Sequence, residues 1–159
     1  MITQELLHAL FDYKDGQLLR KTNRGGKAKG EPTGCNNGHG YLITGVNYRL
    51  YPTHRLIFLY HHGYLPRVVD HINGNKQDNR IENLREATYS QNNYNCTQRT
   101  RNKSGHKNVA WDKSRNKWIV NMRVAKVGKH IGYYDNIEDA INAATKARED
   151  LHKEFARHE

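Results

Sequence analysis

The sequence has 159 residues, a formal net charge of +10, a pI near 9.7 and only 36% hydrophobic residues. This length allows one domain or two small ones, and the positive charge favours a polyanionic partner. There is no run of the roughly 18 apolar residues that a membrane span needs, and the N-terminus lacks a signal-peptide pattern. We therefore expect a cytoplasmic protein with no membrane partner, in which the widely separated Cys35 and Cys96 are reduced thiols.

The first element expected is a short helix. Apolar residues recur there at helical spacing, namely Ile2, Leu6, Leu7, Leu10 and Phe11, and Thr3 is a candidate N-cap. Asp15–Gly16 predicts a tight turn into a strand over residues 17–21. Residues 22–40 are rich in glycine, lysine and asparagine, which predicts a mobile basic loop.

A hairpin and a buried helix are expected next. Two strand-like runs flank residues 45–47, which predicts the hairpin. Thr53 then precedes the apolar stretch HRLIFLYHH, and Gly63 follows it, so we expect a helix capped by Thr53 and ended by Gly63. Val68–Val69 predicts a strand that ends at Asp70.

The character of the sequence changes after Tyr94. Residues 96–108 are polar and basic, which predicts a linker. Three strands follow, with turns at 112–116 and around Gly128, and Trp118, Val120, Met122 and Val124 alternate along the second strand. From Ile137 onward an apolar stripe predicts one helix.

Charge divides unevenly within this second region. Residues 101–129 contain nine Lys or Arg against one acid, whereas residues 130–159 contain four against seven. A solvated charge run is the ordinary explanation, but it does not account for a positive sheet beside a negative helix. A sheet that presents cations to nucleic acid accounts for both.

The asparagine-rich segment VVDHINGNKQDNRIENLREATYSQNNYN, residues 68–95, admits several interpretations. A polar structural loop is one of them. A calcium-binding helix–loop–helix is excluded, because Gly74 and Glu82 fall at positions 5 and 13 counted from Asp70 instead of 6 and 12. Ser90 is expected to cap a helix that begins at Gln91.

The spacing of the polar residues in this segment carries more information. Asp70-His71 ends a strand, Asn83 follows after twelve residues, and Asn92 follows after nine more. The phrase DHINGN…DNRIENLREAT…SQNNYN resembles the phage and intron-borne homing branch of the HNH nucleases, and YKDG, GY and HRLIFLYHHG upstream match as well. The resemblance covers roughly residues 5–95.

The resemblance implies a ββα-metal core at about residues 66–95. It implies that Asp70 and Asn92 hold one Mg²⁺ or Mn²⁺ ion, with Asn93 left open as the alternative ligand. Oxygen donors suit Mg²⁺ and argue against Zn²⁺. His71 would be the general base, since an imidazole is largely neutral near pH 7 and can take a proton. Asn83 would bond the backbone across the loop and keep His71 aimed.

The C-terminal region resembles a second family. KW at 117–118, IGYYD ending at 135 and the helix start at 138–140 are similar to the APETALA/ethylene-response-factor DNA-binding domain. That family reads the major groove with a three-stranded sheet. Alternation places Lys117, Ile119, Asn121 and Arg123 on the face opposite the helix, and Lys107 is the one basic residue of the expected first strand.

Together these features predict an α+β protein. Residues 1–95 form an HNH nuclease domain with a small N-terminal α/β extension, residues 96–108 a linker, and residues 109–159 a three-stranded antiparallel sheet packed on one helix. The expected DNA contacts are Arg55, Lys107, Lys117, Asn121 and Arg123. Arg55 follows His54, for which packing against the hairpin is the simpler interpretation.

The function expected is metal-dependent cleavage of double-stranded DNA by a homing-type endonuclease, in the host cytoplasm if phage-encoded. The protein would act as a monomer or a weak dimer on DNA, and a single site per chain suggests nicking. A non-catalytic DNA-binding regulator is the alternative. A basic RNA-binding protein is disfavoured, because the sequence lacks an aromatic platform for stacking on single strands.

Overall fold

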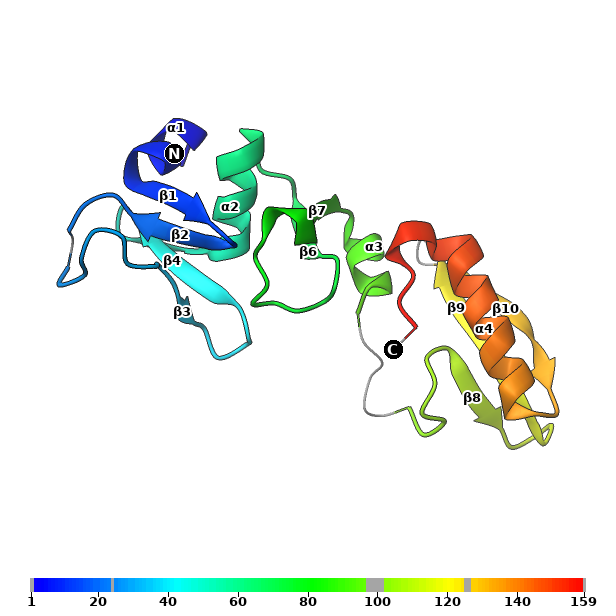
Figure 1. Cartoon of the computed structure of the whole chain (residues 1–159). Coiled ribbons are helices and arrows are strands. Elements are labelled where there is room, and N and C mark those ends of the chain that lie inside the picture. Colours follow the sequence, from blue (N-terminus) through cyan, green and yellow to red (C-terminus); the bar gives the residue numbers. More distant parts are fainter. Residues whose placement is uncertain (1, 24, 97–101, 125–126, 159) are drawn as a thin grey trace. The chain divides into compact units, whose positions relative to one another are not determined.

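The structure is a computed structural model that describes residues 2–23, 25–96, 102–124 and 127–158. It divides into two compact units, Met1–Ala87 and Thr88–Glu159. The helix and strand content confirms the α+β class, with small sheets in both units (Figure 1). None of the helices in these ranges is long and apolar enough to span a membrane.

The first unit begins with the expected short helix, α1 (Gln4–Leu10). The Thr3 hydroxyl accepts a hydrogen bond from the Leu6 N–H at 3.3 Å, which confirms the N-cap. Phe11 does not extend the helix, because its extended backbone starts β1 (Phe11–Lys14). That strand pairs with β2 (Gln17–Arg20) around the predicted turn, where Asp15 and Gly16 both have positive φ.

A second sheet in this unit consists of β3 (Cys35–Asn36), β4 (Leu42–Val46) and β5 (Arg49–Pro52). The predicted hairpin is confirmed, with its tip at Asn47–Tyr48, both at positive φ. The helix that follows is α2 (Thr53–His62), ended by Gly63 in the left-handed conformation. Thr53 is not its cap: Pro52 takes that position, and the Thr53 hydroxyl bonds the Thr44 hydroxyl at 2.9 Å.

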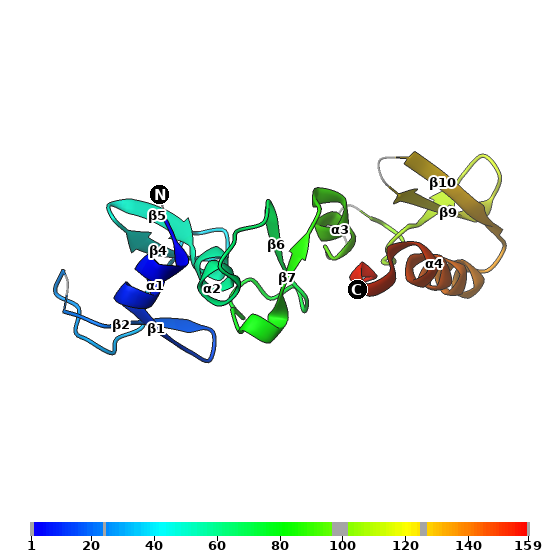
Figure 2. The same ribbon diagram turned by 90° about the horizontal axis from the view of Figure 1, so that it is seen from above.

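Helix α2 is the centre of the first unit. It contacts α1, β2, β4, β5 and β6, and Figure 2 shows it nearly end-on among them. The core gathers around it from elements that are distant in sequence, with the members Leu7, Phe11, Leu18, Val46, Leu56, Ile57, Phe58, Leu59, Val69 and Leu84. Burial of each Leu or Ile contributes about 1.5–3 kcal/mol to the transfer free energy. The site described below lies on this frame.

A two-stranded antiparallel sheet closes the first unit. Strand β6 (Val68–His71) pairs with β7 (Leu84–Ala87), and the 3₁₀ turn η1 (Ile81–Asn83) leads into β7. Val69 and Leu84 are buried in the α2 core. The loop that joins the strands, residues 72–80, contains three asparagines of the asparagine-rich segment, Asn73, Asn75 and Asn79.

The second unit starts with α3 (Tyr89–Tyr94). Its cap is Thr88 rather than the expected Ser90, because the Thr88 hydroxyl accepts from the Gln91 N–H at 3.2 Å. The Gln91 side chain accepts in return from the Thr88 N–H at 2.8 Å, which completes a capping box.

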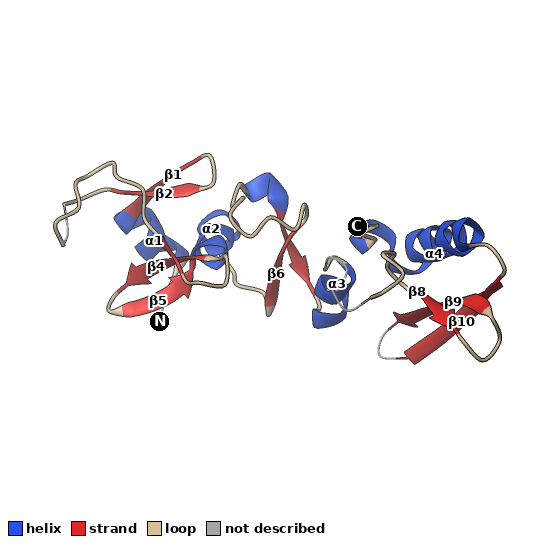
Figure 3. Cartoon of the chain, turned by 90° about the horizontal axis from the view of Figure 1, so that it is seen from below, coloured by secondary structure: helices blue, strands red, loops and turns tan. Residues whose placement is uncertain are grey.

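The rest of the second unit is a sheet covered on one face by a helix (Figure 3). The antiparallel order is β10–β9–β8, built from β8 (Val109–Asp112), β9 (Lys117–Val124) and β10 (Val127–Tyr134). Helix α4 (Ile137–His152) lies against it and leads into η2 (Lys153–Phe155). Three strands followed by one helix are therefore confirmed.

Two details of the second unit differ from expectation. Gly128 lies within β10, opposite Arg123, and is not a turn residue. Of the predicted linker, residues 97–101 lie outside the described residues. Its last part is hydrogen-bonded: the Ser104 hydroxyl donates to the Val109 carbonyl, and Arg148 Nη1 donates to the Lys107 carbonyl, both at 2.7 Å. The domain boundaries at 95 and 109 stay predictions.

Candidate active site

The end of β6 places an acid and an imidazole next to each other in a buried position. Asp70 and His71 are each 5% exposed. Asp70 lies opposite Arg85 on β7, and both Nε and Nη2 of that guanidinium are 3.0 Å from Asp70 Oδ2. A buried carboxylate needs such a partner, since an unpaired one would carry a large desolvation cost.

The His71 ring lies among other rings and is held by an amide. Its Nε2 is 2.9 Å from Oδ1 of Asn79, which is itself only 2% exposed. The ring centroid is 4.8 Å from that of His54 and 6.1 Å from that of Tyr41. These contacts remove the imidazole from water, and Asn79 is a close polar partner of its Nε2.

Burial favours the uncharged form of both imidazoles. Desolvation is the main cause that lowers the pKa of His71 below its ordinary value, partly opposed by the hydrogen bond to Asn79. The same cause, together with repulsion from His71, lowers the pKa of His54 to about 3. A neutral imidazole retains a lone pair, which a general base requires.

Asn83 joins the two sides of the β6–β7 loop. Its Oδ1 accepts from the Asn73 N–H at 3.0 Å, and its Nδ2 donates to the Asp78 carbonyl at 2.7 Å and to Asn73 Oδ1 at 3.0 Å. Asn83 is 8% exposed, so these bonds are largely shielded from water. These bonds join Asn83 to residues of the loop, and the residue that bonds His71 is Asn79.

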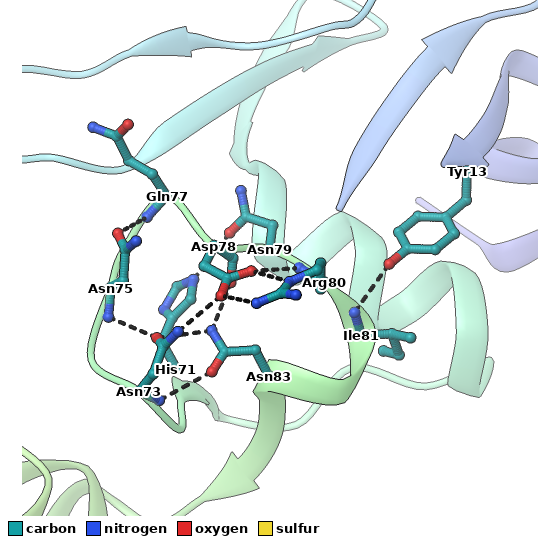
Figure 4. Close-up of polar contacts among 10 residues, drawn as sticks. All are labelled: Tyr13, His71, Asn73, Asn75, Gln77, Asp78, Asn79, Arg80, Ile81 and Asn83. Atoms are coloured by element: carbon teal, nitrogen blue, oxygen red, sulfur yellow. Dashed lines mark hydrogen bonds and ion pairs between the residues drawn. The ribbon is translucent and has the colours of Figure 1, made fainter. Parts of the chain in front are cut away.

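An ion pair lies on the outer side of this loop. Asp78 accepts from Arg80 Nε at 2.8 Å and Nη2 at 2.7 Å, and from Asn73 Nδ2 at 2.8 Å. These bonds hold the pKa of the Asp78 carboxyl well below its usual range, and the bond with Arg80 has the largest effect. Figure 4 shows how the side chains converge within the loop. Asn75 continues the pattern, since its Oδ1 accepts from the Gln77 N–H at 3.1 Å.

The N-terminal hairpin supports the loop from outside. The Tyr13 hydroxyl on β1 accepts from the Ile81 N–H at 3.0 Å (Figure 4). At the β1–β2 turn, Gly16 has φ +80°, and a Cβ there would lie 2.7 Å from Arg80 N and 2.9 Å from the Asn79 carbonyl carbon. Only glycine combines that φ with so close an approach. The backbone of residues 79 and 80 therefore packs directly on the hairpin turn.

The predicted site residues fall into two groups. Asp70, His71 and Asn83 lie together in the first unit, whereas Asn92 and Asn93 lie on α3 in the second. In the ranges that the structure describes, no three His, Cys, Asp or Glu side chains gather where they could hold a metal ion. A carboxylate and an amide oxygen, completed by water and phosphate, are a donor set that fits a hard cation such as Mg²⁺.

Helix α3 is held by other parts of the second unit. The Tyr94 ring stacks on the His152 ring with centroids 3.8 Å apart and planes at 2°. Lys107 Nζ donates to the carbonyls of Tyr94 and Cys96, both at 2.7 Å. Burial lowers the pKa of Lys107 to about 8. Lys107, expected to contact DNA, thus has its ammonium engaged at the end of α3.

The remaining predicted DNA contacts are exposed to different degrees. Arg55 Nη1 donates to the Arg67 carbonyl at 3.0 Å. On β9, Asn121 and Arg123 are exposed while Val120 and Met122 are buried, so alternation places the polar pair on the face away from α4.

That outer face also contains residues that the sequence did not single out. His130 Nδ1 lies 3.0 Å from Asn121 Oδ1, and its ring is 4.7 Å from that of Tyr133. The Arg115 guanidinium lies 4.9 Å from the Tyr133 ring centroid. Lys117 pairs with Asp135 at 2.9 Å. Sequence alternation placed the β9 residues, but the β9–β10 register was needed to find His130 and Tyr133.

Comparison with known proteins bears on this site. Residues 51–94, from β5 to the end of α3, match the HNH endonuclease family. Over 89 residues the chain is 30% identical to Protein 3.8 of Escherichia phage T7, a match that spans 56% of this chain and 73% of that protein. No solved structure matches the chain.

Proposed function

The chain belongs to the HNH endonuclease family, and from this we propose that it is a homing-type, metal-dependent endonuclease acting on double-stranded DNA. The observation that carries the proposal is the buried His71 imidazole beside the buried Asp70 carboxylate, inside the matched segment. A strand end that served structure alone would not need a buried imidazole next to a buried carboxylate.

His71 is proposed as the general base. Its neutral imidazole takes a proton from a water molecule as the water oxygen forms a bond to phosphorus. The bond from phosphorus to the 3′ oxygen breaks, and that oxygen leaves and takes a proton from solvent. The product strands then carry a 5′ phosphate and a 3′ hydroxyl. A positioned base of this kind contributes about 10²–10⁴-fold to rate.

Asp70 and Asn92, with Asn93 as the alternative, are proposed as protein ligands of one divalent ion. Bound there, Mg²⁺ or Mn²⁺ would neutralise charge on the phosphate and on the leaving oxygen. Arg85 holds Oδ2 of Asp70 at 3.0 Å and so orients the carboxylate. Asn83 is proposed to keep the two sides of the β6–β7 loop together, and thereby the end of β6 in place.

The second unit is proposed to dock the enzyme on DNA through the outer face of its sheet, in the manner of the APETALA family. The charge of the sheet supports this proposal, because residues 101–129 contain nine Lys or Arg and one acidic residue. Exposed Asn121 and Arg123 on β9 would reach base edges, and Arg55 in the first unit would contact phosphate. With one site per chain, a monomer would nick, and double-strand cleavage would need two chains.

A nicking assay on supercoiled plasmid tests the proposal. The wild type with Mg²⁺ or Mn²⁺ is expected to convert supercoiled to open-circular DNA, and chelation should stop it. His71→Ala serves as the matched inactive protein and excludes a contaminating nuclease. A protein that binds DNA tightly but leaves every plasmid intact under all these conditions would instead be the non-catalytic regulator.

A further inference from the structure

We infer that Asn79 is a positioning residue that sets the tautomer of His71. In this arrangement the Asn79 side-chain oxygen accepts a hydrogen bond from His71 Nε2–H, so the lone pair of the neutral ring resides on Nδ1. The basic nitrogen would therefore be Nδ1. The inference rests on the proposed nuclease function for its catalytic meaning, but the tautomer can be measured independently of cleavage.

The chemistry of a neutral imidazole makes this assignment specific. Such a ring has one N–H donor and one lone-pair acceptor, and a strong partner at one nitrogen selects which is which. Asn79 Oδ1 lies 2.9 Å from Nε2, and both side chains are at least 95% buried, at 2% and 5% exposure. Water therefore competes weakly for this bond, and a carbonyl oxygen can only accept.

Asn79 is held in place by its neighbours rather than by its own amide. Its N–H donates to the Gln77 carbonyl at 3.1 Å. Arg80, the next residue, is paired to Asp78 at 2.7 Å, and Gly16 packs against the backbone between Asn79 and Arg80. The side chain thus projects from a constrained backbone directly toward His71 (Figure 4).

Within the part of the chain that the structure describes, only one end of the Asn79 amide is hydrogen-bonded, and this distinguishes a residue that positions His71 from one that only stabilises the loop. Among the described residues, Oδ1 has His71 as its partner, whereas buried Nδ2 has no hydrogen-bond partner. A buried amide that only stabilised the loop would be expected to satisfy both ends, since an unpaired buried donor costs stability. Asn73 and Asn83, whose amides bond the loop itself, illustrate that other role.

The reversed amide orientation makes the opposite prediction. If Nδ2 faced His71, it would donate to Nε2, and the ring proton would be forced onto Nδ1. The lone pair of the neutral ring would then point into the protein, toward Asn79. The two orientations differ in one observable quantity, namely which ring nitrogen of His71 carries the proton.

The test is ¹⁵N NMR of the histidine rings in the full-length protein, where His71→Gln identifies the His71 signals. We expect wild-type His71 to be the Nε2–H tautomer. Asn79→Asp, which keeps an acceptor at the same position, should preserve it. Asn79→Leu, of similar size but with no acceptor, should give a mixture with Nδ1–H. Asn75→Leu is the matched control, because Asn75 is an exposed amide of the same loop.

Steady-state cleavage by the same variants completes the test. Asn79→Leu should lower kcat by about 10–100-fold, part of the effect of a general base, while KM for DNA changes less than about 2-fold. The kcat of Asn79→Asp should stay within about 10-fold of the wild-type value. The kcat of Asn75→Leu should equal the wild-type value. If Asn79→Leu does not fold, Asn79→Ala replaces it, with the same expectations.

Two results would overturn the inference. One is an Nδ1–H tautomer in the wild type. The other is an unchanged tautomer and kcat in a folded Asn79 variant that lacks the acceptor. Failure of the proposed function looks different, because the wild type would then cleave nothing while its His71 spectrum still reported the tautomer.

Discussion

The β6–β7 loop and the outer face of the β8–β10 sheet are both polar, but their polarity is organised in opposite ways. The loop and the residues that flank it bury their functional groups: His71, Asn79 and Asn83 are each less than 9% exposed and bonded to one another or to the backbone. The sheet leaves Asn121 and Arg123 exposed on a regular strand. The first arrangement suits a reaction that needs a fixed geometry, and the second suits binding to a charged surface.

The contrast predicts that single changes at the loop abolish chemistry but spare binding. His71→Ala should reduce cleavage by about 100-fold or more, since a general base typically contributes that much. Its affinity for DNA should stay within about 2-fold, because the buried ring offers little surface to a duplex. Single-turnover cleavage and fluorescence anisotropy on one duplex separate the two effects. Cleavage at the wild-type rate between pH 7 and 8 would refute the assignment.

Burial of His54 on α2 should appear as a loss of stability in acid. The pKa of His54 is about 3 in the folded protein and near its ordinary 6.5 when unfolded, so the unfolded chain binds the extra proton between these values. Stability is therefore full above pH 6.5 and falls as the pH drops toward 3, by up to about 1.4 kcal/mol per pH unit from this residue.

Denaturant unfolding of the wild type and His54→Gln between pH 7 and 4 measures this dependence. His54→Gln removes one titrating group and should make the pH dependence of the unfolding free energy shallower, with the contribution of His71 remaining. His39→Gln, at an exposed histidine, is the matched control and should leave it as in the wild type. Parallel curves for wild type and His54→Gln would show that His54 is not the source.

A substitution in the β1–β2 turn can disturb the β6–β7 loop without changing any loop residue. Gly16→Ala places a Cβ 2.7 Å from Arg80 N, so we expect a loss of about 1–3 kcal/mol from strain and displaced backbone, with reduced kcat. Gly38→Ala is the control: it has the same φ of +80° but nothing within 4 Å of the added Cβ. Thermal melts and cleavage rates of the two variants should differ. Equal losses would mean that backbone strain alone, without contact with the loop, explains the effect.

At the sheet the effects should be smaller and confined to affinity. Arg123→Ala, if Arg123 reads a guanine, should cost about 1–3 kcal/mol and relax preference at one base pair. Lys117→Ala should weaken binding to all sequences alike and reduce the salt slope by about one if Lys117 meets phosphate. Because Lys117 already pairs with Asp135, we expect Lys117→Ala to weaken DNA binding less than Arg123→Ala does. Anisotropy titrations at several salt concentrations distinguish the two, with kcat unchanged in both.

Substitutions test this division better than a chain ended near residue 95 would. Such a truncation removes His152 and Lys107, which stack on and cap α3, the helix that contains Asn92. Loss of cleavage could then come from the docking sheet or from an unsupported helix. Point changes at Asn121 or Arg123 leave α3 and its partners intact.

Local patterns in the sequence predicted most of the elements. Period-2 alternation at Trp118, Val120 and Met122 identified β9 and its buried face, because that pattern depends only on strand geometry. Thr3 and Gly63 marked helix ends for a similar reason, since caps are local. Thr53 and Ser90 were misplaced as caps by one and two positions, because the backbone decides where each helix begins: Pro52 takes the cap position of α2, and Thr88 caps α3.

The sequence by itself determined which groups are present: an Asp-His pair at a strand end, asparagines at set spacings, and a basic sheet beside an acidic helix. What only the tertiary structure decided is which asparagine does what. Asn79 and Asn83 are chemically identical and four residues apart, yet one bonds His71 and the other bonds the loop. Their partners depend on how the β6–β7 loop folds back on itself and on Gly16, more than sixty residues away in sequence. Such contacts leave no periodic trace in the sequence, because they depend on side-chain direction rather than on residue type.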